Sequence, residues 1–265
     1  MNSYIVVNSI RYAYPDPMSA LEQSGNRVSS SAGHLVFTDL SFSIDRGLCV
    51  GLVGPNGAGK TTLLWLLAGL LEADAGYIQI DSLVMNKQNR RVIQRKLGLA
   101  FQNPDDMLFM TTVRQDVEFG PRHAGLSDSE VHQRAMNAMK QAGCLHLANR
   151  PPHRLSGGEK RSVSLAAILA MEPEILLLDE PSAALDPRSR RELIQLLSRL
   201  PQTKLIATHD LDMVLDLCDL VFILKEGAIT ASGIPQAILT DRELLHREGL
   251  ELPLSVSRTS FTAIS

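Results

Sequence analysis

The sequence predicts an α/β protein with a mainly parallel sheet that is covered by helices on both faces. Short, continuously apolar segments such as CVGLV at 49–53 and ILLL at 175–178 are typical of strands buried on both faces. Helical patterns follow these segments along the chain, and strands that alternate with helices usually form a parallel sheet. With 265 residues, of which 45% are hydrophobic, the chain can bury one sizeable core with a subdomain attached.

The first part of the chain is read as strands, a loop and a buried helix. Strands are expected at 4–10, 40–44 and 48–53. The stretch at 17–35 is rich in Ser and Gly and has no periodicity, which predicts a mobile surface loop. The segment TTLLWLLAGLL is apolar nearly all round, as a buried helix is, and Ala75 and Gly76 are expected to end it before a strand at 77–80.

The second part is read as strands and helices around a helical insert. A buried strand is expected at 97–101, with Gln102 just past its end, and helical stretches follow from 104 to 153. Met and Ala form one stripe of these helices, which we interpret as core rather than as a binding groove. Further along the chain, helices are expected at 160–171 and 188–200, and strands at 175–180, 204–210 and 220–227.

Composition and charge argue against several classes of protein. The formal net charge is −3 and the pI is about 6.2, whereas proteins that hold nucleic acid chiefly through its phosphates show a basic excess. No nucleic-acid partner is therefore expected. The three cysteines form no CxxC pair and no disulfide framework, and burial is expected for Cys49, Cys144 and Cys218.

Two further features bear on membranes and metals. The N-terminus lacks the pattern of a signal peptide, and the longest apolar run, at 63–71, is shorter than the roughly 20 residues that span a bilayer. The protein is therefore expected to be soluble or peripheral to a membrane. A metal site is not expected at the histidines of the second part, because ligand spacing is lacking at His123, His132, His146 and His153.

A phosphate-binding motif, GPNGAGKTT at 54–62, lies between a predicted buried strand and a predicted helix. It satisfies G-x-x-x-x-G-K-[ST] in the context that this motif requires. Its glycines let successive N–H groups point inward, and the helix N-terminus adds a positive end. Lys60 is expected to bridge the β- and γ-phosphates, and the Thr61 hydroxyl to bind Mg²⁺. The predicted nucleotide contacts are Gly54, Pro55, Asn56, Gly57, Ala58, Gly59, Lys60, Thr61 and Thr62.

Two adjacent carboxylates end the apolar strand at 175–180, and we expect them to divide the work. Asp179 can hold the Mg²⁺ shell, while Glu180 can polarise an attacking water, which is typically worth about 10²–10⁴-fold in rate. These features fit an ATPase, but kinases and other P-loop enzymes share them. A second glycine-rich turn that leads into a helix, LSGGE at 155–159, distinguishes between these classes.

Together the motifs resemble the nucleotide-binding subunit of an ATP-binding-cassette (ABC) transporter. LSGGE is similar to the signature motif of that family, FQNPDD at 101–106 resembles its glutamine loop, and ILLLDEP, SAALDP and ATHD follow in the expected order. The resemblance covers about 4–233. It implies a P-loop NTPase (RecA-like) fold with a mainly parallel sheet core, an antiparallel β subdomain and an α-helical signature subdomain. The implied cofactors are ATP and Mg²⁺.

The resemblance also implies a dimer and a set of roles. In this family two subunits pair head to tail, and the signature turn of one closes over the ATP in the other's P-loop. The turn that would face the partner's ATP consists of Ser156, Gly157, Gly158 and Glu159. The catalytic positions correspond to Glu180, His209 and Gln102, and Mg²⁺ would be held through Thr61, Gln102 and Asp179. Asp186 would lie at the dimer seam.

One aromatic residue is implied to stack on adenine. Tyr14 resembles the family's adenine-stacking residue, and Tyr12, two residues away on the same predicted face, is the alternative. The segment between Tyr14 and Phe37 is longer than the usual turn of the family, so the approach of Tyr14 to adenine stays open.

Within the family, the chain most resembles the ATPases of energy-coupling-factor importers, and most of all their cobalt/nickel branch. There, two ATPases drive an integral membrane coupling subunit that cooperates with a substrate-binding membrane subunit. The implied location is the cytoplasmic face of the cell membrane. Residues 103–121 would contact the coupling helices, with Met107 at a position where many relatives carry Gln.

The interpretations that stay open concern cargo, class and the ends of the chain. The alternatives are a vitamin importer, a soluble ABC ATPase of DNA repair or translation, and a regulatory cassette that binds ATP without hydrolysing it. The regulatory cassette is disfavoured because every catalytic position is filled. The expected domains are an ABC ATPase domain at 1–235, with its helical subdomain at about 103–158, and a helical tail at 236–265. The stretch ELPLSVSRTSFTAIS at 251–265 is expected to be poorly ordered.

Overall fold

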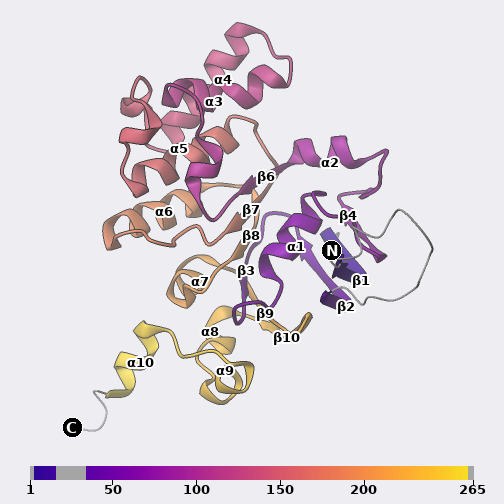
Figure 1. The fold of residues 1–265 in the computed structure, drawn as a ribbon. Helices are drawn as coiled ribbons and strands as arrows, with labels where there is room; N and C mark the ends of the chain where they lie inside the picture. Colours follow the sequence, from indigo (N-terminus) through magenta and orange to yellow (C-terminus); the bar gives the residue numbers. More distant parts are fainter. Residues whose placement is uncertain (1–2, 16–33, 262–265) are drawn as a thin grey trace.

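Two β-sheets form the centre of the computed structural model, which describes residues 3–15 and 34–261 (Figure 1). Within these residues the larger sheet has six strands in the order β10-β9-β3-β8-β7-β6, and all neighbours are parallel except β9 and β10. The strands are β3 (Cys49–Val53), β6 (Leu97–Ala100), β7 (Ile175–Asp179), β8 (Thr203–Ala207), β9 (Leu220–Lys225) and β10 (Ala228–Gly233). Every residue of β3, β7 and β8 is buried, which confirms that both faces of the sheet are covered at these strands.

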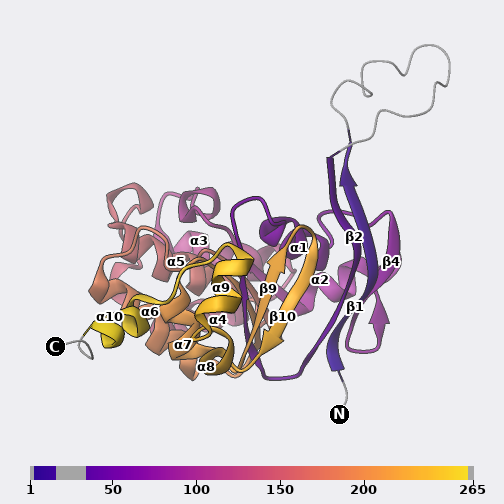
Figure 2. The same cartoon turned by 90° about the horizontal axis from the view of Figure 1, so that it is seen from below.

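The smaller sheet is antiparallel, and within the described chain its four strands follow the order β2-β1-β4-β5. They are β1 (Ser3–Tyr14), β2 (His34–Asp45), β4 (Ala75–Ile80) and β5 (Leu83–Val84). Helix α1 (Lys60–Leu67) shares one hydrophobic core with both sheets, including Phe37 of β2 and Leu52 of β3. Figure 2 shows the smaller sheet at one side of the molecule and helices α3 and α5 at the other, with the larger sheet between them.

The predicted helical insert is confirmed. Helices α3 (Val113–His123), α4 (Asp128–Gln141) and α5 (Gly157–Leu169) pack together beyond β6 (Figure 1). Short 3₁₀ turns lie before α3, at η1 (Pro104–Met107), and between α4 and α5, at η2 (Leu145–Leu147) and η3 (Pro152–Arg154). The stripe of Met and Ala lies in the hydrophobic core through Ala135, Ala138 and Met139, as expected. All three cysteines are buried as well.

The remaining helices cover the sheets and form the C-terminal part. They are α2 (Arg90–Lys96), α6 (Pro187–Arg199), α7 (Leu211–Leu217), α8 (Pro235–Ile238), α9 (Arg242–Glu248) and α10 (Leu254–Phe261). Helix α10 lies within the stretch 251–265, for which poor order is expected. Its first turn is fixed by the carboxylate of Asp212 in α7, which accepts hydrogen bonds from the N–H groups of Leu254 and Ser255 at 3.0 and 3.1 Å.

Two other expectations need comment. The first helix ends at Leu67 rather than at Ala75 and Gly76, because Gly69 has φ +65° and turns the chain toward β4, which already contains those two residues. The predicted surface loop at 17–35 lies outside the described residues, except for His34 and Leu35, which begin β2. None of the helices within 3–15 and 34–261 has the length and apolar character needed to cross a membrane.

Candidate functional site

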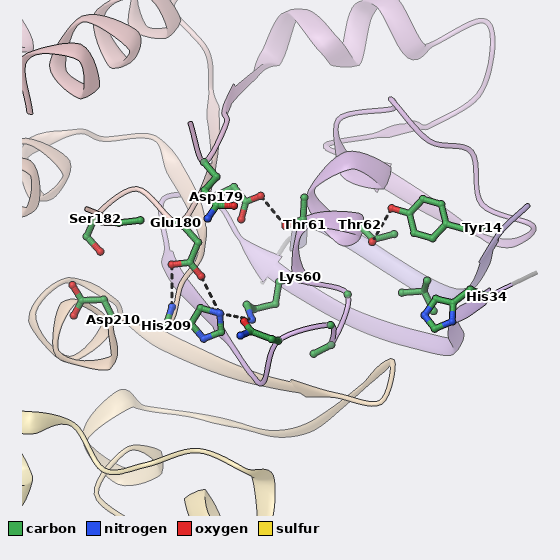
Figure 3. A pocket seen from close by; sticks show the side chains of 17 residues that line it. Tyr14, His34, Lys60, Thr61, Thr62, Asp179, Glu180, Ser182, His209 and Asp210 are labelled. Atoms are coloured by element: carbon green, nitrogen blue, oxygen red, sulfur yellow. Dashed lines mark hydrogen bonds and ion pairs between the residues drawn. The ribbon is translucent and has the colours of Figure 1, made fainter. Parts of the chain in front are cut away.

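A cavity of about 690 Å³ opens where β3, β7 and β8 reach their carboxyl ends (Figure 3). In α/β sheets this edge is the usual place for a ligand. The loop after β3 lines the cavity from Asn56 to Gly59 and leads directly into α1, which has no side-chain cap at Gly59. The first N–H groups of α1 are therefore free to bind an anion. Gly54 begins the loop, with φ +155° and a position at which a Cβ would lie 2.0 Å from the carbonyl oxygen of Leu224.

Lys60 reaches back over this loop. Its Nζ donates hydrogen bonds to the carbonyl oxygens of Gly54 at 2.7 Å and Pro55 at 3.1 Å. Burial lowers the pKa of Lys60, while the nearby carboxylates of Glu180 and Asp179 act in the opposite direction. An ammonium group that is bonded to backbone carbonyls rather than to a carboxylate, in a buried position, favours an incoming anion such as a polyphosphate.

Thr61 and Asp179 provide the oxygen atoms that suit a hard cation. The Thr61 Oγ1 donates a hydrogen bond to Oδ2 of Asp179 at 2.8 Å, and Asp179 is only 6% exposed. Burial raises the pKa of Asp179, although the bond from Thr61 and the charge of Lys60 oppose this effect. Within the described residues there is no group of three or more His, Cys, Asp or Glu residues that could hold a metal. A cation bound here would need phosphate and water oxygens as well, which is how Mg²⁺ is usually held.

Glu180 lies beside Lys60 and His209. Its Oε2 accepts hydrogen bonds from Oγ1 of Thr208 and from the N–H of His209, both at 3.2 Å. The Nε2 of His209 is 3.3 Å from both Lys60 Nζ and Glu180 Oε1 (Figure 3). Lys60 has only donors, so when Nε2 accepts from Lys60 it cannot also donate to Glu180.

The second carboxylate oxygen of Glu180, Oε1, accepts no hydrogen bond from the described residues, although it is buried. The backbone of Glu180 adopts φ +45°, a left-handed conformation that is uncommon for residues other than glycine. A buried oxygen with an unused lone pair in a cavity is well suited to accept a proton from water.

The two candidate tyrosines for the base site, Tyr12 and Tyr14, differ in burial. Tyr12 is 5% exposed and lies in the hydrophobic core, whereas Tyr14 lines the cavity with its hydroxyl 3.1 Å from Oγ1 of Thr62. The two rings are in edge-to-face contact, with their centroids 5.1 Å apart, and a register shift between Tyr12 and Ala13 interrupts the pairing with β2 beside them. His34, which pairs with Tyr14 across β1 and β2, also lines the cavity.

The structure brings together some of the predicted site residues and leaves others apart. The cavity wall contains Gln102, Asp179, Glu180 and His209 together with the phosphate loop. No residue from 155 to 159 is among the described residues that line it. Ser156 instead caps α5 and forms a capping box with Glu159, whose Oε2 accepts from the Ser156 N–H at 2.8 Å. Asp186 caps α6.

Sequence reasoning missed several residues around the site. Val36, Ser182 and Ala183 also line the cavity. Asp210, next to His209, forms a two-pronged ion pair with Arg190 of α6 at 2.5 and 2.8 Å. Burial raises the pKa of Asp210, but the bonds from Arg190 and from the N–H of Met213 outweigh it, so the pKa falls below its usual value. Ser182 and Ala183 belong to the motif SAALDP and Asp210 to ATHD, but their place around the cavity depends on contacts between segments far apart in the chain.

Comparison with known proteins identifies the family. The family model for ABC transporters matches residues 37–183. The chain belongs to the ABC transporter family. This ABC ATPase is 45% identical over 249 residues to a putative ABC transporter ATP-binding protein of Streptomyces coelicolor, covering 94% of this chain and 96% of the relative.

Two further comparisons confirm the resemblance of this ABC ATPase to energy-coupling-factor proteins. It is 40% identical over 259 residues to the energy-coupling factor transporter ATP-binding protein EcfA of Carboxydothermus hydrogenoformans, covering 97% of this chain and 90% of EcfA. The solved structure of CbiO1 from Clostridium perfringens, part of the ABC transporter complex CbiONQ, is similar with a TM-score of 0.80 and 33% identity, covering 98% of this chain and 100% of CbiO1. The predicted P-loop fold with its two subdomains is thereby confirmed.

Proposed function

We propose that this ABC ATPase is the ATP-hydrolysing subunit of an energy-coupling-factor importer at the cytoplasmic face of the cell membrane. The observation that carries the proposed chemistry is the free Oε1 of Glu180, buried beside Lys60 in the cavity. This oxygen can accept a proton from a water that attacks the γ-phosphate. The similarity to EcfA and CbiO1 supports the role in transport.

Lys60 and the phosphate loop would hold the β- and γ-phosphates. On binding, Lys60 would exchange its two bonds to backbone carbonyls for charged phosphate oxygens, which form stronger hydrogen bonds. His209 would then place a ring nitrogen near the γ-phosphate, because its Nε2 already lies 3.3 Å from Lys60 Nζ. The free N–H groups at the start of α1 complete the cradle.

The oxygen atoms of Thr61, Gln102 and Asp179 fit Mg²⁺ as ligands or through water. Thr61 and Asp179 are already held together by their hydrogen bond, and Gln102 faces the same cavity. When bound, Mg²⁺ would neutralise charge on the β- and γ-phosphate oxygens. The buried carboxylate of Asp179, whose pKa is raised by burial, favours a cation beside it.

Tyr14 would stack on adenine. Replacing it with alanine is expected to raise the KM for ATP by about 5-fold or more while kcat changes little. The reason is that stacking holds the base and not the reacting phosphate. Steady-state ATPase measurements test this. Tyr14→Phe is the matched control, since it keeps the ring and loses only the hydroxyl contact with Thr62, and should stay close to the unsubstituted protein. An unchanged KM in Tyr14→Ala would remove the residue from the base site.

The signature turn supports a head-to-tail dimer. Ser156 and Gly158 lie at the start of α5, outside the nucleotide cavity of their own chain, and line a separate cavity of about 540 Å³ beside α6. A phosphate that meets this turn would therefore belong to a second ATPase subunit. The N–H groups at the start of α5 and the Ser156 hydroxyl would contact the γ-phosphate, and Asp186 would lie at the same seam.

A pair of exposed aromatic rings would contact the membrane coupling subunit. Phe109 is 63% exposed and Phe119 is 43% exposed, and their ring centroids are 5.0 Å apart. The buried carboxylate of Asp116 fixes this segment by accepting from the N–H groups of Phe109 and Met110, both at 3.0 Å. Met107 packs against the helical core, so the predicted contact at 103–121 would rest on the two phenylalanines.

The double substitution Phe109→Ala and Phe119→Ala is expected to abolish recovery of integral membrane partners when the tagged protein is purified from detergent-solubilised native membranes. The matched control is Tyr77→Ala, which removes a ring of similar exposure, 42%, on β4. The unsubstituted protein should bring down a coupling subunit and a substrate-binding membrane subunit, identified by mass spectrometry. Recovery of soluble proteins alone would instead favour an ABC ATPase that works without a transporter.

For the cargo we propose cobalt or nickel ions, supported by the similarity to CbiO1. Cargo passes through the membrane subunits, so the co-purified substrate-binding protein decides the question. Binding of Co²⁺ or Ni²⁺ by that protein would support the proposal, and binding of a vitamin in its place would overturn it.

A further inference from the structure

Arg161 connects the signature helix to the glutamine loop of the same chain. It lies in α5, five residues after the cap Ser156, and is only 3% exposed. Its Nη1 donates to the carbonyl oxygen of Phe101 at 2.9 Å and its Nη2 to that of Gln102 at 2.6 Å. One planar guanidinium group therefore holds two successive carbonyls through two separate nitrogens in a fixed geometry, which the single ammonium nitrogen of a lysine does not reproduce.

Two other contacts join the same elements. A Cβ at Gly98 of β6 would lie 2.3 Å from Cγ2 of Ile168, so β6 and the second half of α5 are packed in direct contact. At the surface, Lys160 forms an ion pair with Asp105 at 2.6 Å. Helix α5 thus touches β6, the glutamine loop and η1 in succession, and Arg161 is the buried contact in the middle.

The buried charge makes this connection stiff. Burial lowers the pKa of Arg161, and the carboxylate of Asp179 acts against that effect. No carboxylate within the described residues forms an ion pair with Arg161 at hydrogen-bond distance, and its Nε has no partner there. Moving α5 away from the loop would leave the whole guanidinium without acceptors, which is costly for a buried cation. The loop and the start of α5 therefore move together.

We propose that Arg161 is a positioning residue that couples the two nucleotide sites of the dimer. The carbonyls it holds belong to Phe101 and to Gln102, the residue that faces the chain's own nucleotide, while α5 begins with the turn that faces the partner's nucleotide. Nucleotide and cation bound at Gln102 would thus set the position of Ser156 and Gly158. This inference rests on the roles given above to Gln102 and the signature turn.

Hydrogen exchange of the full-length protein tests this coupling, at a concentration where light scattering shows a monomer. In the unsubstituted protein, a non-hydrolysable ATP analogue with Mg²⁺ should slow exchange of the peptide at 155–165 by about 5-fold or more, the size of a typical coupling between sites. In Arg161→Lys this slowing should disappear although the affinity for the analogue is unchanged. The surface variant Lys160→Ala should behave like the unsubstituted protein.

Steady-state kinetics supply a second readout that a merely structural role would not produce. Arg161→Lys should lower kcat by about 5-fold or more and reduce the Hill coefficient for ATP toward one, with KM unchanged. Equal slowing of exchange in Arg161→Lys and the unsubstituted protein would overturn the coupling. An absence of slowing in the unsubstituted protein would also overturn the coupling, and this outcome does not depend on whether Arg161→Lys folds. Failure of the unsubstituted protein to bind the analogue would instead count against the proposed function.

Discussion

Replacing Glu180 with glutamine should lower the rate of ATP hydrolysis by about 10²–10⁴-fold while ATP binding is retained. Glutamine keeps the size of the side chain and can still accept hydrogen bonds from Thr208 and the N–H of His209 at one oxygen. It replaces the free Oε1, however, with an amide nitrogen that cannot accept a proton. The measurement is single-turnover hydrolysis together with equilibrium binding of ATP.

Glu172→Gln is the matched control for this prediction. Glu172 also has a positive φ, +53°, but its carboxylate is 61% exposed and pairs with Arg134 at the surface. The control should hydrolyse ATP like the unsubstituted protein. Residual activity of Glu180→Gln above a third of the unsubstituted rate would show that Glu180 is not the general base.

Local motifs explain why much of the candidate site could be predicted from sequence. The phosphate loop and the Asp179–Glu180 pair each follow a continuously apolar strand, and the carboxyl ends of β3 and β7 meet at one edge of the sheet. The same strands fixed the prediction of a parallel, doubly covered sheet. A motif that ends a buried strand is therefore located as soon as the strand is recognised.

Contacts between distant segments explain most of what was missed. His34 lies in the stretch predicted as a loop, but it begins β2. There it pairs with Tyr14 of β1, and both residues line the cavity. Arg161 is about 60 positions from the carbonyls it binds, so no spacing in the sequence reveals it. The proposal of Tyr14 rather than Tyr12 rests on which side chain lines the cavity and which is buried, and the alternation of side chains in the sequence does not show this.

Short elements were missed for a different reason. Strands β5 and β10 and helices α2, α7 and α8 are too short or too exposed to give a periodic signal, and tertiary contacts decide their conformation. The length of α1 was overestimated because the apolar pattern runs on to Leu71, although the chain turns at Gly69. Beyond the helix, Leu71 still packs against the core, whereas Leu70 is 55% exposed.

Replacing Asp179 with asparagine should have two effects of opposite sign. The ligand-free protein should become more stable, because burial raises the pKa of Asp179 and the charged carboxylate is therefore disfavoured in the folded state. Asparagine can still accept the hydrogen bond from Thr61, so the contact with α1 is kept. We expect a rise in Tm of about 2 °C or more, together with a loss of Mg²⁺-dependent ATP hydrolysis of about 100-fold or more.

The pH dependence of the ligand-free protein follows from the same shift. A carboxyl group whose folded pKa lies above its unfolded value binds a proton more tightly in the folded state. Its charged form therefore destabilises the fold above the raised pKa, and this penalty disappears as pH falls through the raised pKa to the ordinary aspartate value. The gain in Tm from Asp179→Asn should be full at neutral pH and should vanish in acid.

Asp116→Asn is the control that separates the two effects. Asp116 is also buried, at 4% exposed, and burial likewise raises its pKa, but it lies in α3, away from the nucleotide cavity. Hydrolysis by the isolated protein should be unchanged in Asp116→Asn. If Asp179→Asn raised Tm without loss of Mg²⁺-dependent hydrolysis, the carboxylate would be a buried structural group and Mg²⁺ would be held elsewhere. A fall in Tm would show instead that the attraction to Lys60 outweighs the cost of burial.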